Sequence, residues 1–257
     1  MAAEGTYNPA TKILTVTGDG MPSPVSYGTF PNDNNPNTVA AYTFNHSFLY
    51  RGGENTTGAS SVPLGIVGFT SNGVAIFNPS AGSGGSPPTG FHWVATADYG
   101  MVNFGEDSYG GHPESTGQYH YHDGEFLTGF KENQIMSLYN DYYGQSQFGQ
   151  DNLRHPDGHS KILGFAFDGY PVYGPYGYNL PTDNTSPIVL METGYQMRSS
   201  IATNRPAYGI TLANPPKGSL MEDYEYNVSK PGRHLDVYNG RFCNTPEFPS
   251  GTFAYFI

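Results

Sequence analysis

The chain has 257 residues and a formal net charge of -11, from 11 basic and 22 acidic side chains. This acidic balance argues against phosphate backbones and anionic membrane surfaces as the main partner, so we expect no nucleic-acid ligand. The apolar runs are too short to span a bilayer, and the first residues lack the basic start and apolar stretch of a signal peptide. We therefore expect neither membrane insertion nor an export signal in this chain.

The composition favours turns and strands over helices. Charged residues make up 13% of the chain, whereas Gly, Pro, Tyr and Phe number 34, 21, 21 and 16. Such a balance disfavours long surface helices and suits aromatic-packed strands joined by turns. We expect a mainly β protein with long loops and at most one or two short helices. The single cysteine, Cys243, excludes an intrachain disulfide, and we expect it to be a small, partly buried hydrophobic residue.

In chain order, the first predicted element is a strand. Residues 7–17 alternate toward their end like a half-buried strand and stop at a Gly-Asp-Gly turn, which predicts an edge strand. Residues 31–37 and 80–89 are rich in Asn, Pro, Gly and Ser and predict exposed loops. A partial apolar helical face predicts one short helix over residues 130–143. The other predicted strands span residues 65–69, 74–77, 91–97, 118–122, 162–167, 171–173 and 252–257.

Three sequence motifs occur twice in the same order. Residues 72–79 resemble 168–175, residues 107–112 resemble 236–241, and residues 117–122 resemble 251–256. A repeat of this kind predicts one pseudo-symmetric domain in which two copies of a unit pack together. We predict a single domain over residues 1–257, made of an N-terminal β extension (1–64), a first repeat (65–125), an insertion with a short helix (126–160) and a second repeat (161–257).

The last pair of motifs separates two kinds of side chain. Because strand side chains alternate, Tyr119 and Tyr121 share one face of their strand, and their counterparts Phe253 and Tyr255 are also aromatic. The other face carries His120 and His122, whose counterparts are Ala254 and Phe256. The aromatic face is kept in both copies and the imidazole face in only one. We expect the aromatics to be scaffold and the imidazoles to serve local function or local packing.

The tetrad Tyr119-His-Tyr-His122 and its surroundings resemble the YHYH protein family, which occurs in bacteria, some eukaryotes and phages and is defined by its motif. The likeness runs from about residue 65 to the C-terminus. Its specific parts are residues 73–79, 111–113, 119–122, 159–160, 163–175, 235–236 and 239–240. The resemblance marks five structural motif residues: Tyr119, Tyr121, Asp236, Asn239 and Gly240. It implies no established activity.

One departure from the family bears on where the protein is made. At two positions where the family usually has cysteine, this chain has Tyr109 and Tyr238. If those cysteines pair in the family, their joint loss fits assembly in a reducing compartment. A virion protein assembled in a bacterial cytoplasm would meet this description, as would a cytoplasmic protein.

The His-x-His pair is the strongest candidate for chemistry. His120 and His122 lie on one face of a predicted strand, at a spacing that lets both bind one Zn²⁺ or Cu²⁺ ion. Two ligands do not make a tight site, and the residues that could complete it are His112, His159, Asp107, Asp123, Asp168 and Asp236. The alternative is that the histidines form hydrogen bonds in a polar core. We find no nucleophile elbow, P-loop or dinucleotide fingerprint, and assign no catalytic and no cofactor-binding residue.

Three functions follow as expectations. The first is a non-enzymatic structural or binding module of a phage virion or an extracellular surface, with other structural proteins or copies of itself as partners and an embedded metal site. The second is a metal-dependent, hydrolase-like enzyme that uses His120 and His122. The third is a carbohydrate-binding module that would need exposed aromatic platforms for surface glycans.

Overall fold

The fold is known from a computed structural model. It describes residues 4–22, 27–50, 65–70, 73–78, 105–107, 110–122, 154–200 and 223–257. The regular elements in these ranges are β-strands, which confirms the predicted mainly β class. The predicted helix at 130–143, the strand at 91–97 and the loop at 80–89 lie outside the described residues. A helix long and apolar enough to cross a membrane is not found in the described ranges.

The N-terminal strands form a small sheet of their own. Strands β1 (Glu4–Asn8), β2 (Ile13–Gly18) and β3 (Phe44–Leu49) pair in the order β1-β2-β3. The prediction of one edge strand over residues 7–17 is therefore wrong, because the chain turns back within it and β2 lies in the middle. The cause is local: the Asn8 side chain accepts hydrogen bonds from the backbone N–H groups of Ala10 and Thr11, at 3.0 and 3.3 Å.

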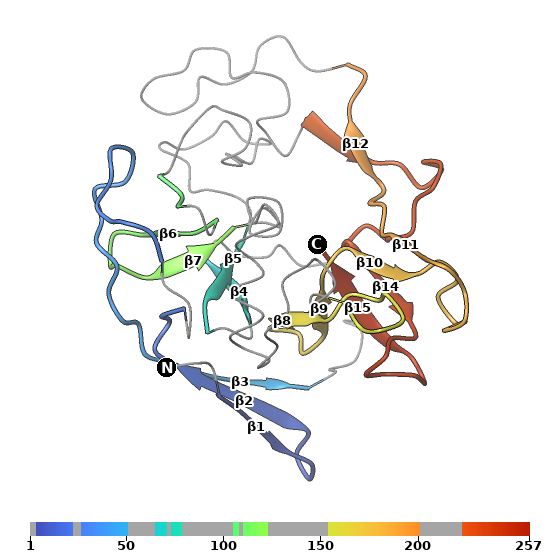
Figure 1. Ribbon diagram of the computed structural model, residues 1–257, viewed down its shortest axis with the longest axis horizontal. Helices are drawn as coiled ribbons and strands as arrows, with labels where there is room; N and C mark the ends of the chain where they lie inside the picture. Colours follow the sequence, from blue (N-terminus) through green and yellow to red (C-terminus); the bar gives the residue numbers. More distant parts are fainter. Residues whose placement is uncertain are drawn as a thin grey trace.

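Eight strands form the central sheet, in the order β14-β15-β9-β8-β4-β5-β7-β6, from right to left in Figure 1. They are β4 (Ile66–Thr70), β5 (Ala75–Phe77), β6 (His112–Pro113), β7 (Tyr119–Tyr121), β8 (Ile162–Ala166), β9 (Pro171–Tyr173), β14 (Gly240–Cys243) and β15 (Thr252–Phe256). Two small ribbons stand apart, β10 (Tyr176–Tyr178) with β11 (Ile188–Leu190), and β12 (Tyr195–Met197) with β13 (Tyr224–Tyr226).

Both halves of the central sheet have the same order and the same pairing. From the antiparallel pair β4–β8 outward, each half continues with an antiparallel, then a parallel, then an antiparallel neighbour. The registers also correspond: Ile76 pairs with Tyr121 in one half, and Val172 pairs with Tyr255 in the other. Each inner hairpin has a register shift at the same place, after Ile66 and after Ile162.

The turns that lead into the outermost strands have matching hydrogen bonds. The backbone N–H of Asp107 donates to the carbonyl of Gly111, and that of Asp236 donates to the carbonyl of Gly240, at 2.9 and 2.8 Å. Each aspartate also accepts a bond on its side chain from the N–H of the same glycine. These turns place His112 opposite His120, and Arg241 opposite Ala254. The motifs that resemble each other in sequence thus occupy corresponding places in the sheet.

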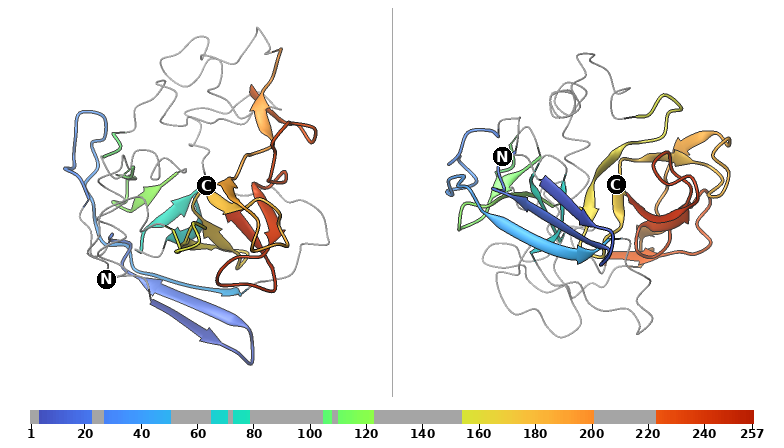
Figure 2. Two further views of the ribbon diagram at one scale, coloured as in Figure 1. Left: turned by 45° about the vertical axis from the view of Figure 1, so that its right-hand side comes forward. Right: turned by 90° about the horizontal axis from the view of Figure 1, so that it is seen from below.

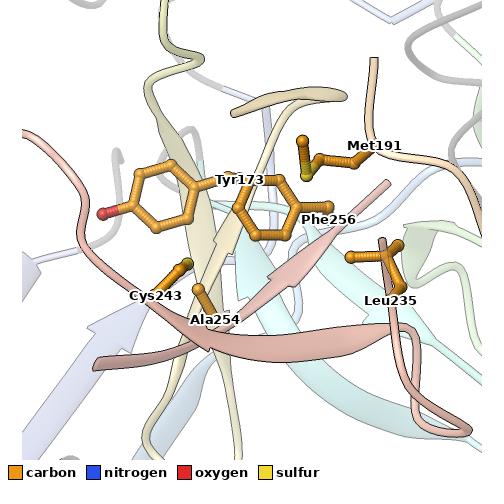
Figure 3. Packing of buried hydrophobic residues seen from close by; sticks show 6 residues of the cluster. All are labelled: Tyr173, Met191, Leu235, Cys243, Ala254 and Phe256. Atoms are coloured by element: carbon orange, nitrogen blue, oxygen red, sulfur yellow. The ribbon is translucent and has the colours of Figure 1, made fainter. Parts of the chain in front are cut away.

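Two apolar clusters lie on one face of the central sheet. The N-terminal sheet packs along the middle strands (Figure 2), where the rings of Phe44 and Phe69 stack with centroids 3.9 Å apart. The second cluster lies beneath β9, β14 and β15 and is shown in Figure 3; its members are Tyr173, Met191, Leu235, Cys243, Ala254 and Phe256. Cys243 is fully buried there, and its burial raises the pKa of the thiol. Its predicted role as a buried hydrophobic residue is confirmed.

The sequence predicted an exposed loop at residues 31–37, but part of this segment is buried. Asn35 is buried, and its side-chain amide donates to the carbonyl of Pro113 at 3.0 Å. The Asn37 amide donates to the same oxygen at 3.1 Å. Hydrogen bonds from amide side chains, which apolar content does not measure, attach this segment to the outer edge of the sheet.

The close approach of β4 and β8 generates a prediction about stability. A Cβ atom on Gly164 would overlap the backbone carbonyl of Phe69, which cannot move without breaking the pairing of the two strands. We expect Gly164→Ala to lower the free energy of unfolding by about 1–3 kcal/mol or more, measured by denaturant titration. Gly5→Ala is the control, since its Cβ would meet only the end of Leu14 at 3.5 Å. Equal stability of the two variants would contradict this account of the sheet centre.

Candidate metal centre

Three imidazoles meet at the outer end of the first half of the sheet. His120 lies in β7, and His122 lies two residues later on the same face because strand side chains alternate. His112 lies in β6, which pairs with β7 so that His112 is directly opposite His120. Antiparallel neighbours that are directly opposite each other point to the same face of a sheet. Local strand geometry therefore brings the three side chains together.

The Nε2 atoms of His112 and His122 both lie close to the Nε2 atom of His120. The distance from His112 Nε2 to His120 Nε2 is 3.0 Å, and from His120 Nε2 to His122 Nε2 it is 3.1 Å. All three potential ligand atoms lie within 4.8 Å of one another. Zinc bound to imidazole has Zn–N bonds of about 2.0–2.1 Å, so ligand atoms on one tetrahedral ion lie only slightly farther apart than these two pairs.

The far side of two of the rings is fixed by the backbone. His120 Nδ1 is 3.0 Å from the carbonyl oxygen of Gln118, and His122 Nδ1 is 2.9 Å from the carbonyl oxygen of Asn78. A carbonyl only accepts hydrogen bonds, so each Nδ1 carries the proton and donates it. In the neutral imidazole the Nε2 atom then has a free lone pair. This is the outer-shell arrangement that orients metal-binding histidines in proteins.

Hydrogen bonding within the cluster does not satisfy all of these atoms. With Nδ1 protonated on both rings, the Nε2 atoms of His120 and His122 present two lone pairs to each other at 3.1 Å, and neither can donate. One proton on His112 Nε2 could serve His120 but would leave the contact between His120 and His122 unbonded. A cation held among the three rings would bind the lone pairs of both His120 and His122. The donor set therefore fits a borderline or soft divalent ion such as Zn²⁺ or Cu²⁺.

Burial keeps the imidazoles of His120 and His122 neutral. His112 and His120 are 5% and 2% exposed, and the ring of Phe77 stacks on His120 with centroids 3.9 Å apart. Burial, reinforced by the neighbouring His112 and His122, holds the pKa of His120 well below its usual value. Burial also lowers the pKa of His122. At neutral pH both rings are therefore neutral, with a proton on Nδ1 and a free lone pair on Nε2, which is the form that metal ions need.

The corresponding place in the second half of the sheet carries no imidazole. His112, His120 and His122 correspond to Arg241, Ala254 and Phe256 by strand register and motif. Ala254 and Phe256 are buried in the apolar cluster of Figure 3, with the Phe256 ring stacked on Tyr173 at 5.7 Å. The corresponding strand positions thus carry no histidine, although the buried ring of His159, from outside these strands, packs beside Phe256 with centroids 6.0 Å apart.

The other predicted ligands are elsewhere in the described structure. Asp107 accepts a hydrogen bond from the Tyr119 hydroxyl, and Tyr119 is on the opposite face of β7 from the histidines. Asp168 accepts a bond from the Tyr255 hydroxyl in the second half of the sheet. His159 is buried against Tyr173 and Tyr178, and its Nδ1 donates to the carbonyl of Ser160 at 2.7 Å. Of the predicted ligands that the structure describes, His112 alone joins His120 and His122.

Two further aspartates, Asp236 and Asp123, were predicted as possible ligands. The side chain of Asp236 bonds the backbone of its own turn, accepting from the N–H groups of Tyr238 and Gly240. Asp123 lies outside the described residues. In the described ranges, the group of His, Cys, Asp or Glu side chains whose ligand atoms could share one ion consists of His112, His120 and His122.

Three contributors to the centre were missed by the sequence analysis. Gln118 and Asn78 act through their backbone carbonyls, and a backbone carbonyl leaves no side-chain signal in a sequence. Phe77 was predicted only as part of a strand, but its ring forms one wall of the cluster. A search for aromatic residues one strand away from the His-x-His pair would have identified it.

The five structural motif residues have structural contacts. Tyr119 and Tyr121 are 0% and 1% exposed, with their rings edge to face at 5.8 Å. Asp236, Asn239 and Gly240 form the turn before β14, and Asn239 has a positive φ of 56° there. Asparagine tolerates that conformation better than most residues.

The fold and site together describe a β-structured protein with a tri-histidine cluster at one end of its main sheet. A model of the YHYH protein family matches residues 47–257. The chain therefore belongs to the YHYH protein family, as its motifs indicated. Neither the curated proteins nor the solved structures include a significant match to the chain.

The lowered histidine pKa values predict how the metal-free protein responds to pH. Unfolded histidine has a pKa of about 6.5, so below that pH the unfolded chain binds protons that folded His120 and His122 do not. The free energy of unfolding should fall by up to about 1.4 kcal/mol per pH unit per histidine as pH drops below about 6.5. Denaturant titrations between pH 7.5 and 5 in the presence of a chelator measure this slope.

The matched control is the double variant His120→Asn, His122→Asn, which cannot titrate in this range. Its stability should depend less steeply on pH than that of the unaltered chain. The same slope in both proteins would show that these imidazoles are not held neutral by burial.

Proposed function

We propose that this protein is a non-enzymatic structural or binding module that holds a transition-metal ion at His112, His120 and His122. One observation carries the proposal: the Nε2 atoms of His120 and His122 face each other at 3.1 Å while their Nδ1 atoms donate to backbone carbonyls. Hydrogen bonding among the three rings can satisfy the lone pair of His120 but not that of His122 as well, whereas an ion would satisfy both. Zinc or copper suits three neutral imidazole ligands best.

The second half of the sheet supports a functional reading of the histidines. There the corresponding strands end in Ala254 and Phe256 within an apolar cluster. Two of the three histidine positions, those of Ala254 and Phe256, are apolar in that half, so the fold does not require histidine at them, although Arg241 and His159 are buried at the same end. Burying imidazoles where Ala254 and Phe256 pack instead costs free energy unless the rings are hydrogen-bonded or bind an ion.

In this proposal, the ion stabilises one end of the central sheet. It would join β6 to β7 at the edge of the sheet, where pairing is shortest, since β6 spans only His112–Pro113. A metal that binds the folded chain and not the unfolded chain adds its binding free energy to stability. A robust surface or virion component would benefit from such a fastening.

The setting we propose is a phage virion or an extracellular surface, with assembly in the cytoplasm and with other structural proteins or further copies of the chain as partners. Turn-rich aromatic composition, only 13% charged residues and a single cysteine support this setting. Native mass spectrometry of the purified chain tests self-assembly, for which a stable oligomer is the expected result.

A metal-dependent hydrolase is the second candidate, and the ligand count favours it. The described residues supply three histidine ligands. Three protein ligands are typical of catalytic zinc sites, whereas structural sites usually have four. Bound zinc would supply an acidic water there. Hydrolysis of a nitrophenyl ester by the zinc-loaded chain, lost when His120 and His122 are replaced, would favour the enzyme over the structural module.

The metal centre is tested by elemental analysis of the full chain, expressed with added zinc or copper and purified at neutral pH. We expect stoichiometric metal, and no metal in the double variant His120→Ala, His122→Ala. At a free metal concentration 100-fold above Kd, bound metal should raise the free energy of unfolding by about 2.7 kcal/mol.

His155→Gln serves as the control because His155 pairs with Glu247 at 2.7 Å, outside the cluster. This variant should keep its metal. A metal-free wild-type protein after supplemented expression would refute the centre, as would full metal content in the double variant.

A further inference from the structure

The opposite face of the central sheet differs between its two halves in how well it is covered. In the first half this face carries Tyr119 and Tyr121, which are 0% and 1% exposed. Their counterparts Phe253 and Tyr255 are only partly buried. The contrast is larger one strand farther out, where Pro113 is fully buried and its counterpart Phe242 is 60% exposed.

A segment of the chain itself covers this face in the first half. Residues 27–42, here called the strap, run along the β6–β7 end of the sheet (Figure 1). The rings of Tyr27 and Phe30 lie 5.9 and 6.3 Å from the ring of Tyr119. The backbone N–H of Ala40 donates to the carbonyl of Gly117 at 2.9 Å. The strap makes a tight turn in which Asn32 and Asn35 exchange backbone hydrogen bonds. It has the single charged residue Asp33 and is rich in Asn, Pro and aromatic side chains.

On the second half this place holds a connected group of partly exposed rings. We call Tyr170, Phe242, Phe253 and Tyr255 the aromatic patch. Tyr170 and Tyr255 each contact Phe253 edge to face, with centroids 5.3 Å apart. Phe242 and Phe253 are directly opposite each other on β14 and β15. The Phe242 ring lies over Gly251, which is the position that Ala40 takes over Gly117 in the first half.

We propose that the aromatic patch docks a polypeptide segment of a partner protein that resembles the strap, being rich in aromatic and proline residues and poor in charged ones. The first half of the same sheet shows which kind of segment fits this face. A net charge of -11 disfavours an acidic segment. The adjoining Asp168 carboxylate, bonded to the Tyr255 hydroxyl, adds negative charge at the rim.

The ring geometry favours a peptide over a sugar. A carbohydrate platform presents flat ring faces, whereas the rings of Tyr170 and Phe253 are inclined by 65°, and those of Phe253 and Tyr255 by 83°. Inclined rings form ridges and hollows that aromatic and proline side chains can fill, as Tyr27 and Phe30 do on Tyr119. The patch is on the other face of the sheet from the histidine cluster, so docking is independent of the metal.

The test is fluorescence anisotropy with a labelled synthetic peptide of residues 27–42, titrated with the full chain. We expect saturable binding that Phe242→Ser weakens about tenfold or more, because an exposed aromatic anchor contributes much of such an interface. Phe242→Tyr keeps the ring and should retain binding, which separates loss of the contact from misfolding. Val228→Ser, at a residue that is 68% exposed and outside the patch, should bind like the unaltered chain.

Several outcomes would overturn the proposal. One is the lack of saturable binding, and another is binding that Phe242→Ser leaves unchanged, since the peptide would then be displacing the chain's own strap. A glycan bound through Phe242 on an array, without peptide binding, would make the patch a carbohydrate site. A native dimer that Phe242→Ser converts to monomer, without peptide binding, would make the occupant a second copy of the chain.

Discussion

The antiparallel pairing of β4 with β8 is the interaction on which the rest of the structure depends. Phe69 and Phe165 pair at its centre, with Gly68 and Gly164 on either side of them. A side chain on either glycine would collide with the backbone of the other strand. Because the two strands lie so close together, their pairing fixes which side chains point to each face at the centre of the sheet. The strands farther out in both halves pair from this centre, so their side chains are assigned to the same two faces.

This assignment of side chains to faces decides what each side of the sheet can do. One side receives the N-terminal sheet over its middle, the histidine cluster at one end and an apolar cluster at the other. The opposite side carries Tyr119 and Tyr121 beneath the strap, and Phe253 and Tyr255 in the aromatic patch. Strand alternation thus keeps the proposed metal centre and the proposed docking face apart, although both are built from residues that are neighbours in sequence.

The difference between the two halves is chemical more than architectural. Where the first half has His112, His120 and His122, the second has Arg241, Ala254 and Phe256. Where the first half buries Pro113 beneath amide side chains, the second exposes Phe242. Two halves with matching strand order can thus differ in chemistry, one end holding the proposed metal centre and the other supplying packing on one face and an exposed aromatic surface on the other. In and directly after β7, buried tyrosines alternate with the histidines of the proposed centre.

The sequence by itself determined the β class, most of the central strands, the matching order of the motifs and the pairing of His120 with His122 on one face, because alternation and turn residues are local properties. It could not place the hairpin within residues 7–17, since a side-chain hydrogen bond from Asn8 decides that turn. Only the tertiary structure selected His112 over His159, Asp107 and Asp168 as the third imidazole or carboxylate of the cluster. That choice depends on the register in which β6 pairs with β7, and a two-residue strand such as β6 has no alternating pattern from which its register could be predicted.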